Sequence, residues 1–201
     1  MEPIAAIKRV TDVEVVGRTP AFLEAHVLKS LEIIGAGSIG RGQLAKELRL
    51  GEGTIRTLVG RMKGLGLLST SRGGMTLTES GLGVLSGFHG LLKSTEIPET
   101  TMTVDSKNYA VLVYGAAGVV RKGIEQRDAA LMAGAKGATT LVREEGRLIM
   151  PGMEDPFDPA VIEFIEDALK PSDGDVVIMG SSDDSFLAEI GAKTAALKLL
   201  E

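Results

Sequence analysis

Apolar residues recur at intervals of three and four between residues 20 and 64, and this periodicity limits the fold of the chain more than any other feature. In the segment 20–34 they stand at Leu23, Val27, Leu28, Leu31 and Ile34. Shorter sets follow in 41–49 and 53–64. This spacing places apolar side chains on one face of a helix. The sequence therefore predicts three amphipathic helices, the first starting at Thr19–Pro20, because Thr caps helices and Pro suits their first turn.

The segment Gly35–Gly40 reads G-x-G-x-x-G, the pattern of a dinucleotide-binding loop. Such a loop needs a buried strand before its glycines and, about 20 residues later, an acid that ends a second strand. Here a predicted helix precedes the glycines, and two helical segments follow them. We therefore expect a helix-ending turn at Gly35 and a tight connection into the next helix, and no dinucleotide cofactor.

Two short segments, 65–71 and 75–78, flank the basic glycine turn Arg72–Gly74 and predict a β-hairpin. Residues 79–92 predict a further helix. Helix, helix, turn, helix and hairpin is the order of a winged helix-turn-helix domain.

In such a domain the second helix of the pair enters the major groove of DNA. The candidate DNA contacts are Gly53, Thr54, Arg56, Thr57, Arg61 and Arg72. Arg56 can donate two hydrogen bonds to guanine, and the two threonines can contact thymine methyl groups. We expect Arg61 to contact phosphate, Gly53 to leave room for the DNA backbone, and Arg72 to reach phosphate or the minor groove from the wing. The alternatives are an ordinary solvated helix and a winged helix that docks another protein.

The stretch SIGRGQLAKELRLGEGTIRTLVGRMKGLGLLSTSRGGMTLTESG resembles prokaryotic winged-helix transcription regulators, and the resemblance covers residues 20–92. The shared features are an LxELGL-type helix, a Thr-Ile-Arg recognition helix and a "LT..G" segment after the wing. The segment GIEQRDAALMAGAKGATTLV further resembles archaeal two-domain winged-helix proteins, whose C-terminal domain has no assigned function. Gly60 and Gly64 depart from the family pattern of the recognition helix. They are expected to weaken this helix, because each glycine costs about 1 kcal/mol relative to alanine.

Charge divides the chain into two parts. Residues 1–95 hold 12 basic and 8 acidic side chains, a balance of +4, whereas residues 96–201 hold 10 and 19, a balance of −9. This asymmetry indicates two domains with different partners. We expect a winged helix DNA-binding domain over 1–95, a linker over 96–106, and a sensor or dimerisation domain over 107–201.

The acidic part predicts a second α+β domain. Strand-like and helical segments alternate in the order βαββαβ, and a final helix follows. This order predicts a ferredoxin-like sandwich, with a parallel doubly wound sheet as the alternative. The whole chain is thus expected to be α+β.

Small residues follow two of the expected strands, and exposed amides at a helix start can bind an anion. The candidate ligand-binding residues are Gly115, Gly118, Gly180, Ser181 and Ser182. A ferredoxin-like sheet would place the two groups at opposite ends, whereas a parallel sheet would bring them together. The simpler interpretation is that Ser181, Ser182 or Asp183 caps the last helix. A small anionic or polar effector is the expected ligand.

Composition narrows the remaining functions. The chain has no Cys and only two His, which argues against a thiolate or histidine metal site. No signal peptide or membrane-length apolar run is present, so we expect a cytoplasmic protein that does not enter a membrane. No catalytic motif stands out, and we expect no enzyme and no cofactor.

The sequence predicts a transcription regulator that binds double-stranded DNA as a homodimer. The alternatives are a protein-interaction module and a nucleotide-dependent or kinase-like enzyme.

Overall fold

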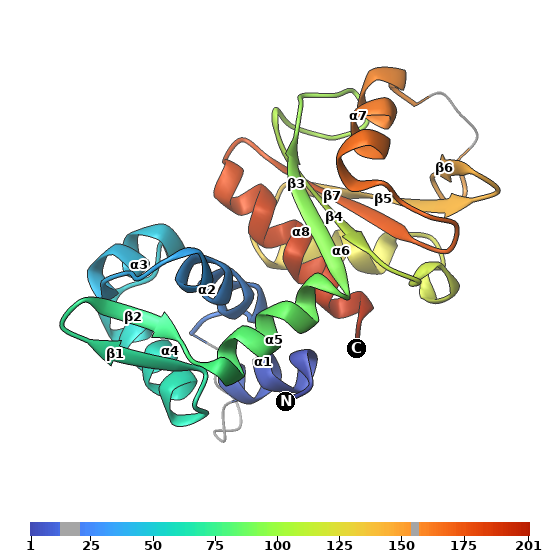
Figure 1. The fold of residues 1–201 in the computed structure, drawn as a ribbon. Coiled ribbons are helices and arrows are strands. Elements are labelled where there is room, and N and C mark those ends of the chain that lie inside the picture. The colour runs from blue at the N-terminus through green and yellow to red at the C-terminus, as the bar shows by residue number, and fades with distance from the viewer. Residues whose placement is uncertain (13–20, 154–156) are drawn as a thin grey trace. The chain divides into compact units, whose positions relative to one another are not determined.

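The computed structural model describes residues 1–12, 21–153 and 157–201. The chain divides into two compact units, Met1–Gly90 and Leu91–Glu201 (Figure 1). The expected boundary after residue 95 and the expected linker over 96–106 differ from this division. The reason is that Leu92–Ile97 is a strand of the second unit's sheet, so this unit begins immediately after the last helix of the first.

The first unit is helical and carries one small hairpin. Its elements are α1 (Pro3–Thr11), α2 (Glu24–Ala36), α3 (Arg41–Leu48), α4 (Glu52–Gly64), β1 (Leu68–Ser71), β2 (Gly74–Leu77) and α5 (Glu79–His89). Helices α2, α3, α4 and α5 and the hairpin confirm the expected succession of elements. Thr19 and Pro20, expected to start the first helix, lie outside the described residues. Helix α1 was not expected; the Glu2 carboxylate caps it by accepting hydrogen bonds from the amides of Ile4 and Ala5.

One apolar face of each helix supplies the core of this unit. The fully buried side chains include Ile7, Val27, Leu28, Leu31, Leu44, Leu48, Ile55, Leu58, Met62 and Phe88. The periodicity of three and four predicted these faces for α2, α3 and α4. Because α4 packs in this way, its opposite face points away from the core, which makes it available for contact.

The glycine motif is a helix end and a turn, as expected, but its details differ. Gly35 lies inside α2, and a Cβ there would come within 2.5 Å of Leu85 Cδ2, so this glycine allows α2 and α5 to pack closely. Helix α2 ends at Ala36 instead, with Gly37 as its C-cap, and Gly40 is the N-cap of α3. The preceding segment is a helix and not a buried strand, which rules out a dinucleotide-binding loop here.

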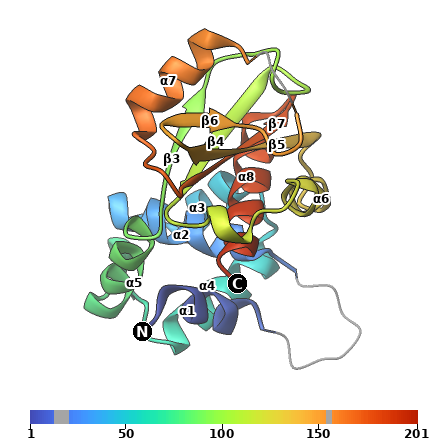
Figure 2. The ribbon, with the colours of Figure 1, turned by 90° about the vertical axis from the view of Figure 1, so that its right-hand side faces the viewer.

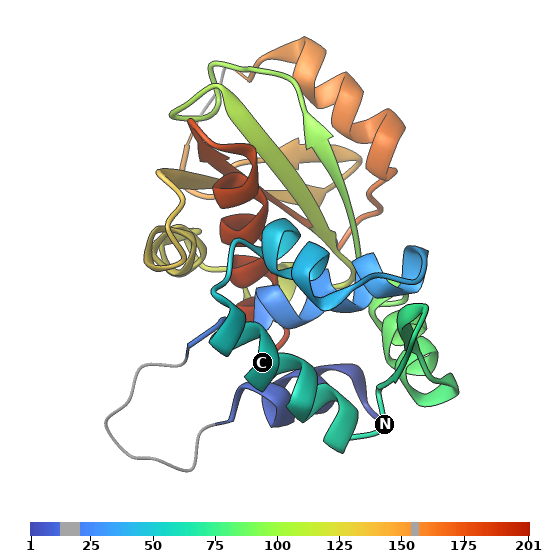
Figure 3. The ribbon, with the colours of Figure 1, turned by 90° about the vertical axis from the view of Figure 1, so that its left-hand side faces the viewer.

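The second unit is a five-stranded sheet with helices on both faces. Its elements are β3 (Leu92–Ile97), β4 (Lys107–Val113), η1 (Ala117–Val119), α6 (Ile124–Met132), β5 (Gly137–Glu144), β6 (Arg147–Ile149), α7 (Pro159–Leu169), β7 (Val176–Ser182) and α8 (Ser185–Leu199). The strand order is β3-β4-β7-β5-β6, and all neighbours are antiparallel. Figure 3 shows β3 along one edge of the sheet beside β4.

Helix α7 covers one face of this sheet, and α6 and α8 cover the other (Figure 2). Between α7 and the sheet, the core includes Ile165 of the helix and Leu112, Leu141, Val177 and Met179 of the strands. None of the helices in the described part of the chain is long and apolar enough to cross a membrane.

The ferredoxin-like prediction is wrong in its strand order. The sequential order βαββαβ plus a helix is as expected, with β3 added before it. A ferredoxin-like sheet would insert β6 between β4 and β5. Instead β7 lies there, and β6 occupies the edge. Strand β7 suits the centre because all seven of its residues are buried, whereas the three-residue β6 buries only Leu148.

Candidate nucleic-acid interface

The outward face of α4 carries four of the candidate DNA contacts. Ile55, Leu58, Val59 and Met62 hold the helix in the core. Helical spacing then directs Arg56 and the neighbouring residues outward: Gly53, Arg56 and Thr57 are exposed, and Thr54 is half-buried. The structure therefore brings these four together at the N-terminal end of one helix, with a guanidinium and two hydroxyl groups among them.

The hairpin is held against the segment that precedes α3. Ile39 and Met75 exchange backbone hydrogen bonds of 3.2 and 2.8 Å, and Ser38 Oγ donates to the Gly73 carbonyl at 2.6 Å. Gly74 has φ +116°, and a Cβ there would lie 2.6 Å from Ser38 Oγ. Arg72 is exposed at the turn between β1 and β2. Its guanidinium is therefore mounted on a turn that is held against the segment before α3.

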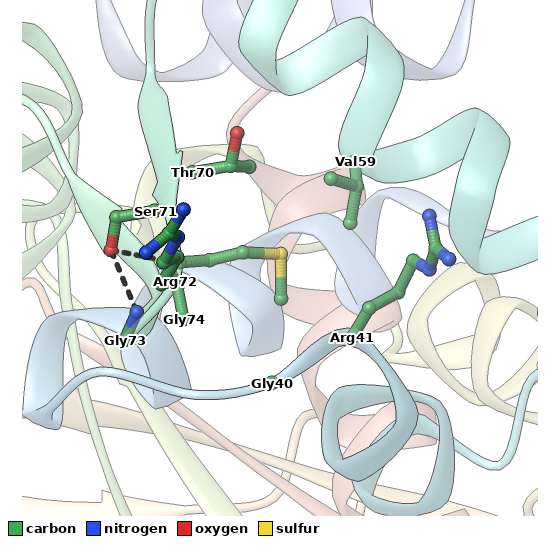
Figure 4. A pocket seen from close by; sticks show the side chains of 9 residues that line it. Gly40, Arg41, Val59, Thr70, Ser71, Arg72, Gly73 and Gly74 are labelled. Atoms are coloured by element: carbon green, nitrogen blue, oxygen red, sulfur yellow. Dashed lines mark hydrogen bonds between the residues drawn. The ribbon is translucent and has the colours of Figure 1, made fainter.

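A hollow of about 450 Å³ separates the hairpin from α3 and α4. Val59 of α4 and Arg72 of the hairpin both line it, and so does Arg41 at the start of α3 (Figure 4). Arg41 was not among the DNA contacts predicted from the sequence, because those were sought in the recognition helix and the wing, and Arg41 lies in neither. Its position at the start of a helix was the available signal, since a cation there opposes the helix dipole.

Arg61 does not lie with the other candidates. Its Nη1 donates hydrogen bonds of 2.9 Å to the carbonyls of Val10 and Asp12, and its guanidinium carbon lies 5.8 Å from the centre of the Phe22 ring. The guanidinium thus ties the end of α1 to α4. Arg61 is thus engaged inside the first unit, and its expected contact with phosphate stays a prediction.

We expect Arg61→Ala to destabilise the protein by about 2 kcal/mol, because hydrogen bonds from a charged donor contribute roughly 1.5–3 kcal/mol when buried and this group is half-buried. Urea unfolding followed by circular dichroism measures the change. Arg56→Ala on the exposed face of the same helix is the matched control and should leave stability within about 0.5 kcal/mol. Equal stability of Arg61→Ala and wild type would show that α1 is held by its apolar contacts alone.

The candidate ligand residues at the end of β7 are internal. A Cβ on Gly180 would lie 2.4 Å from the Ala188 carbonyl oxygen and 2.7 Å from the Ala192 nitrogen, so α8 packs directly on this glycine. Ser181 Oγ accepts from the Asp105 amide at 2.9 Å, and Ser182 is fully buried. The last helix is capped by Asp184, whose carboxylate accepts from the amides of Phe186 and Leu187, and not by the residues expected to cap it.

An ion cluster closes the same end of the sheet. Lys136 Nζ lies 2.9 Å from carboxylate oxygens of both Asp105 and Asp183. The hydrogen bonds between Lys136 and the two aspartates lower the pKa of both carboxyl groups and raise the pKa of the lysine. Lys136 is thus paired with two carboxylates of its own unit.

The second candidate group, Gly115 to Gly118, is at the opposite end of the sheet. Val113 at the end of β4 pairs with Val176 at the start of β7, as expected for antiparallel strands. The Gly115 amide donates to Asp175 Oδ1 at 2.8 Å, and the Ala117 amide donates to the Gly174 carbonyl at 2.9 Å. The amides of Gly115 and Ala117 are thus paired within the chain, and the expected ligand site at Gly115 and Gly118 stays a prediction.

Two family models match the chain. Residues 25–92 match the CggR N-terminal DNA binding domain, and residues 104–199 match a domain of unknown function, DUF4443. The chain joins a CggR-like unit to a DUF4443-like unit. The hypothetical protein PH0730 from Pyrococcus horikoshii OT3 has a similar structure, with a TM-score of 0.73 and 26% identity over 89% of this chain and 92% of that one. Comparison with curated proteins gives no match.

The CggR-like unit confirms the expected resemblance to DNA-binding regulators and implies DNA as a partner. Neither matched family is described as an enzyme. Within the described residues, no group of three His, Cys, Asp or Glu side chains is placed to hold a metal ion. The role of the DUF4443-like unit is unknown.

Proposed function

We propose that the chain is a transcription regulator whose first unit is a winged helix-turn-helix domain. Helix α4 is the recognition helix, and the β1–β2 hairpin is the wing. The order of helices and hairpin and the match to a CggR-type domain support this proposal. In this fold the recognition helix enters the major groove with its N-terminal residues leading.

One observation carries the proposal: α4 buries an apolar face and presents Thr54, Arg56 and Thr57 outward beside the wing. Arg56 makes no hydrogen bond or ion pair with any described residue, so its donors are free for a base edge. Gly53 and Gly60 are also exposed, and a Cβ added to either would have no atom within 4 Å, which leaves the helix backbone open to close approach.

The distribution of charge supports different roles for the two units. The balance of +4 in residues 1–95 favours the DNA phosphates, and the balance of −9 in residues 96–201 repels them. We therefore assign DNA contact to the first unit and the sensing of an effector or dimerisation to the second. A homodimer would place two α4 helices on two half-sites and double the contact of one small domain.

The substitution Arg56→Lys should keep most of the affinity for random duplex DNA and lose the preference for guanine at one position. Lysine retains the charge, but it lacks the planar fork that donates two hydrogen bonds to guanine. The expected loss of discrimination is about 1–3 kcal/mol. Fluorescence anisotropy with the preferred duplex and its single-base variants measures it in the full chain.

Arg56→Ala separates charge from geometry, because it should lose the same preference and also weaken binding to every sequence. If both variants discriminate between bases as well as wild type does, α4 is not the recognition helix. If no duplex binds wild type at any salt concentration, the proposal of a DNA-binding regulator fails, and docking of a protein by the winged helix is the alternative to test.

A further inference from the structure

A hollow lies between the wing and helices α3 and α4, and residues of all three elements line it. Its volume of about 450 Å³ is within the range of sites that enclose small molecules or parts of larger ones. The wing contributes Thr70 to Met75, α4 contributes Val59, and the start of α3 contributes Gly40 and Arg41. Three elements that are separate in the sequence therefore meet around one open space.

Cations and apolar groups alternate across this space. Figure 4 shows the Arg41 and Arg72 side chains on opposite sides of this space, and Val59 and Met75 are also among its lining residues. Val59 and Met75 are only 8% and 3% exposed, so they form the floor. Neither arginine makes a hydrogen bond or an ion pair with another residue of the described ranges.

Arg41 stands where stability alone would disfavour it. Gly40 is the N-cap of α3, so Arg41 is the first residue of that helix, and its charge opposes the positive end of the helix dipole. An anion bound at the guanidinium would remove this repulsion. Because Ile39 pairs with Met75 and Ser38 bonds to Gly73, the two arginines are also mounted on segments that are joined to each other.

We propose that this hollow binds one segment of the DNA sugar-phosphate backbone. Arg41 and Arg72 contact successive phosphates, and the deoxyribose between them lies over Val59 and Met75. The alternation of anion, apolar ring and anion in the backbone matches that of cation, apolar floor and cation in the hollow. This inference rests on the proposed function and adds Arg41 and a defined backbone segment to it.

The test is the salt dependence of duplex binding by the full chain. Each phosphate contact contributes about 0.9 to the slope of log K against log salt concentration. Arg41→Ala and Arg72→Ala should each reduce the slope by about 0.9, and the double variant should reduce it by about twice as much. Arg121→Ala, an exposed arginine of the second unit, is the control for net charge and should leave the slope unchanged.

Neutral methylphosphonate substitutions along the preferred duplex locate the contacts. Two successive positions should weaken wild-type binding; Arg41→Ala should be insensitive at one of them and Arg72→Ala at the other. Unchanged slopes in both variants, with DNA binding intact, would overturn the backbone site and leave the proposed function standing.

Inorganic pyrophosphate distinguishes a free phosphorylated ligand from DNA. If wild type binds no duplex DNA but binds pyrophosphate in a calorimetric titration that Arg41→Ala abolishes, the hollow serves a small molecule and both proposals fail. If it binds neither, the hollow is not a phosphate site. Duplex binding with the slopes described above, and weak competition by pyrophosphate, would support the backbone site.

Discussion

Lowering the pH from 6.5 to 4 should reduce the free energy of unfolding of the first unit by about 3 kcal/mol, because of His26. Burial lowers the pKa of this histidine from 6.5 to about 4. Its Nδ1 accepts a hydrogen bond of 3.0 Å from the Leu23 amide at the start of α2, which requires the ring nitrogen to be unprotonated. Below pH 6.5 His26 is protonated in the unfolded chain but stays neutral in the folded chain until about pH 4. The free energy of unfolding is therefore greatest above pH 6.5 and falls toward pH 4.

His26→Gln should remove this pH dependence while keeping the start of the helix intact. A glutamine at this position can accept the same hydrogen bond from the Leu23 amide. The matched control is His89→Gln, since His89 is exposed at the end of α5. Urea unfolding at a series of pH values measures the effect. An equal loss of stability in wild type and His26→Gln over this interval would contradict the assignment to His26.

Replacing Gly180 by valine should destabilise the second unit by about 3 kcal/mol or more, because overpacking a close contact typically costs about 1–3 kcal/mol and here the clash is with backbone. The Ala188 carbonyl oxygen and the Ala192 nitrogen, which would meet the new Cβ at 2.4 and 2.7 Å, belong to α8. Helix α8 can make room only by moving away from the sheet. Thermal unfolding of the full chain, followed by circular dichroism, measures the loss.

Gly118→Ala provides the comparison, because no atom lies within 4 Å of the added Cβ. We expect its effect to stay within about 0.5 kcal/mol. If Gly180→Val is as stable as Gly118→Ala, then α8 does not pack on β7 as the structure places it, and the assignment of Gly180 to packing and not to ligand binding loses its basis.

Local pattern predicts most of the first unit. The spacing of Val27, Leu28 and Leu31 identifies α2, and the basic glycine turn identifies the hairpin, because both signals are contained in neighbouring residues. Helix α1 carries a comparable signal that the prediction did not use, with Glu2 as its cap and Ile7 and Val10 on its inner face. Local pattern does not predict the hydrogen bonds of Arg61, because its partners Val10 and Asp12 are 51 and 49 residues away in the sequence.

In the second unit the elements are more predictable than their arrangement. The polar residues Ser94, Thr95 and Glu96 are typical of a linker, whereas they belong to an edge strand that is anchored by Leu92 and Ile97. The central place of β7 depends on long-range pairing, which leaves little trace in local sequence. Small residues at its end, such as Gly180, suggest a ligand site because close packing and close ligand approach demand the same residue types.

Selection of duplex DNA from a random pool by the full chain decides whether this protein is a sequence-specific regulator. We expect repeated selection to enrich one motif that contains a guanine contacted by Arg56, and Arg56→Lys to enrich the same motif without preference at that position. Two copies of the motif related by two-fold symmetry would support the homodimer, and a single copy would contradict it. A pool that stays random through successive rounds, with binding that is insensitive to salt, would contradict DNA recognition by α4 and the wing.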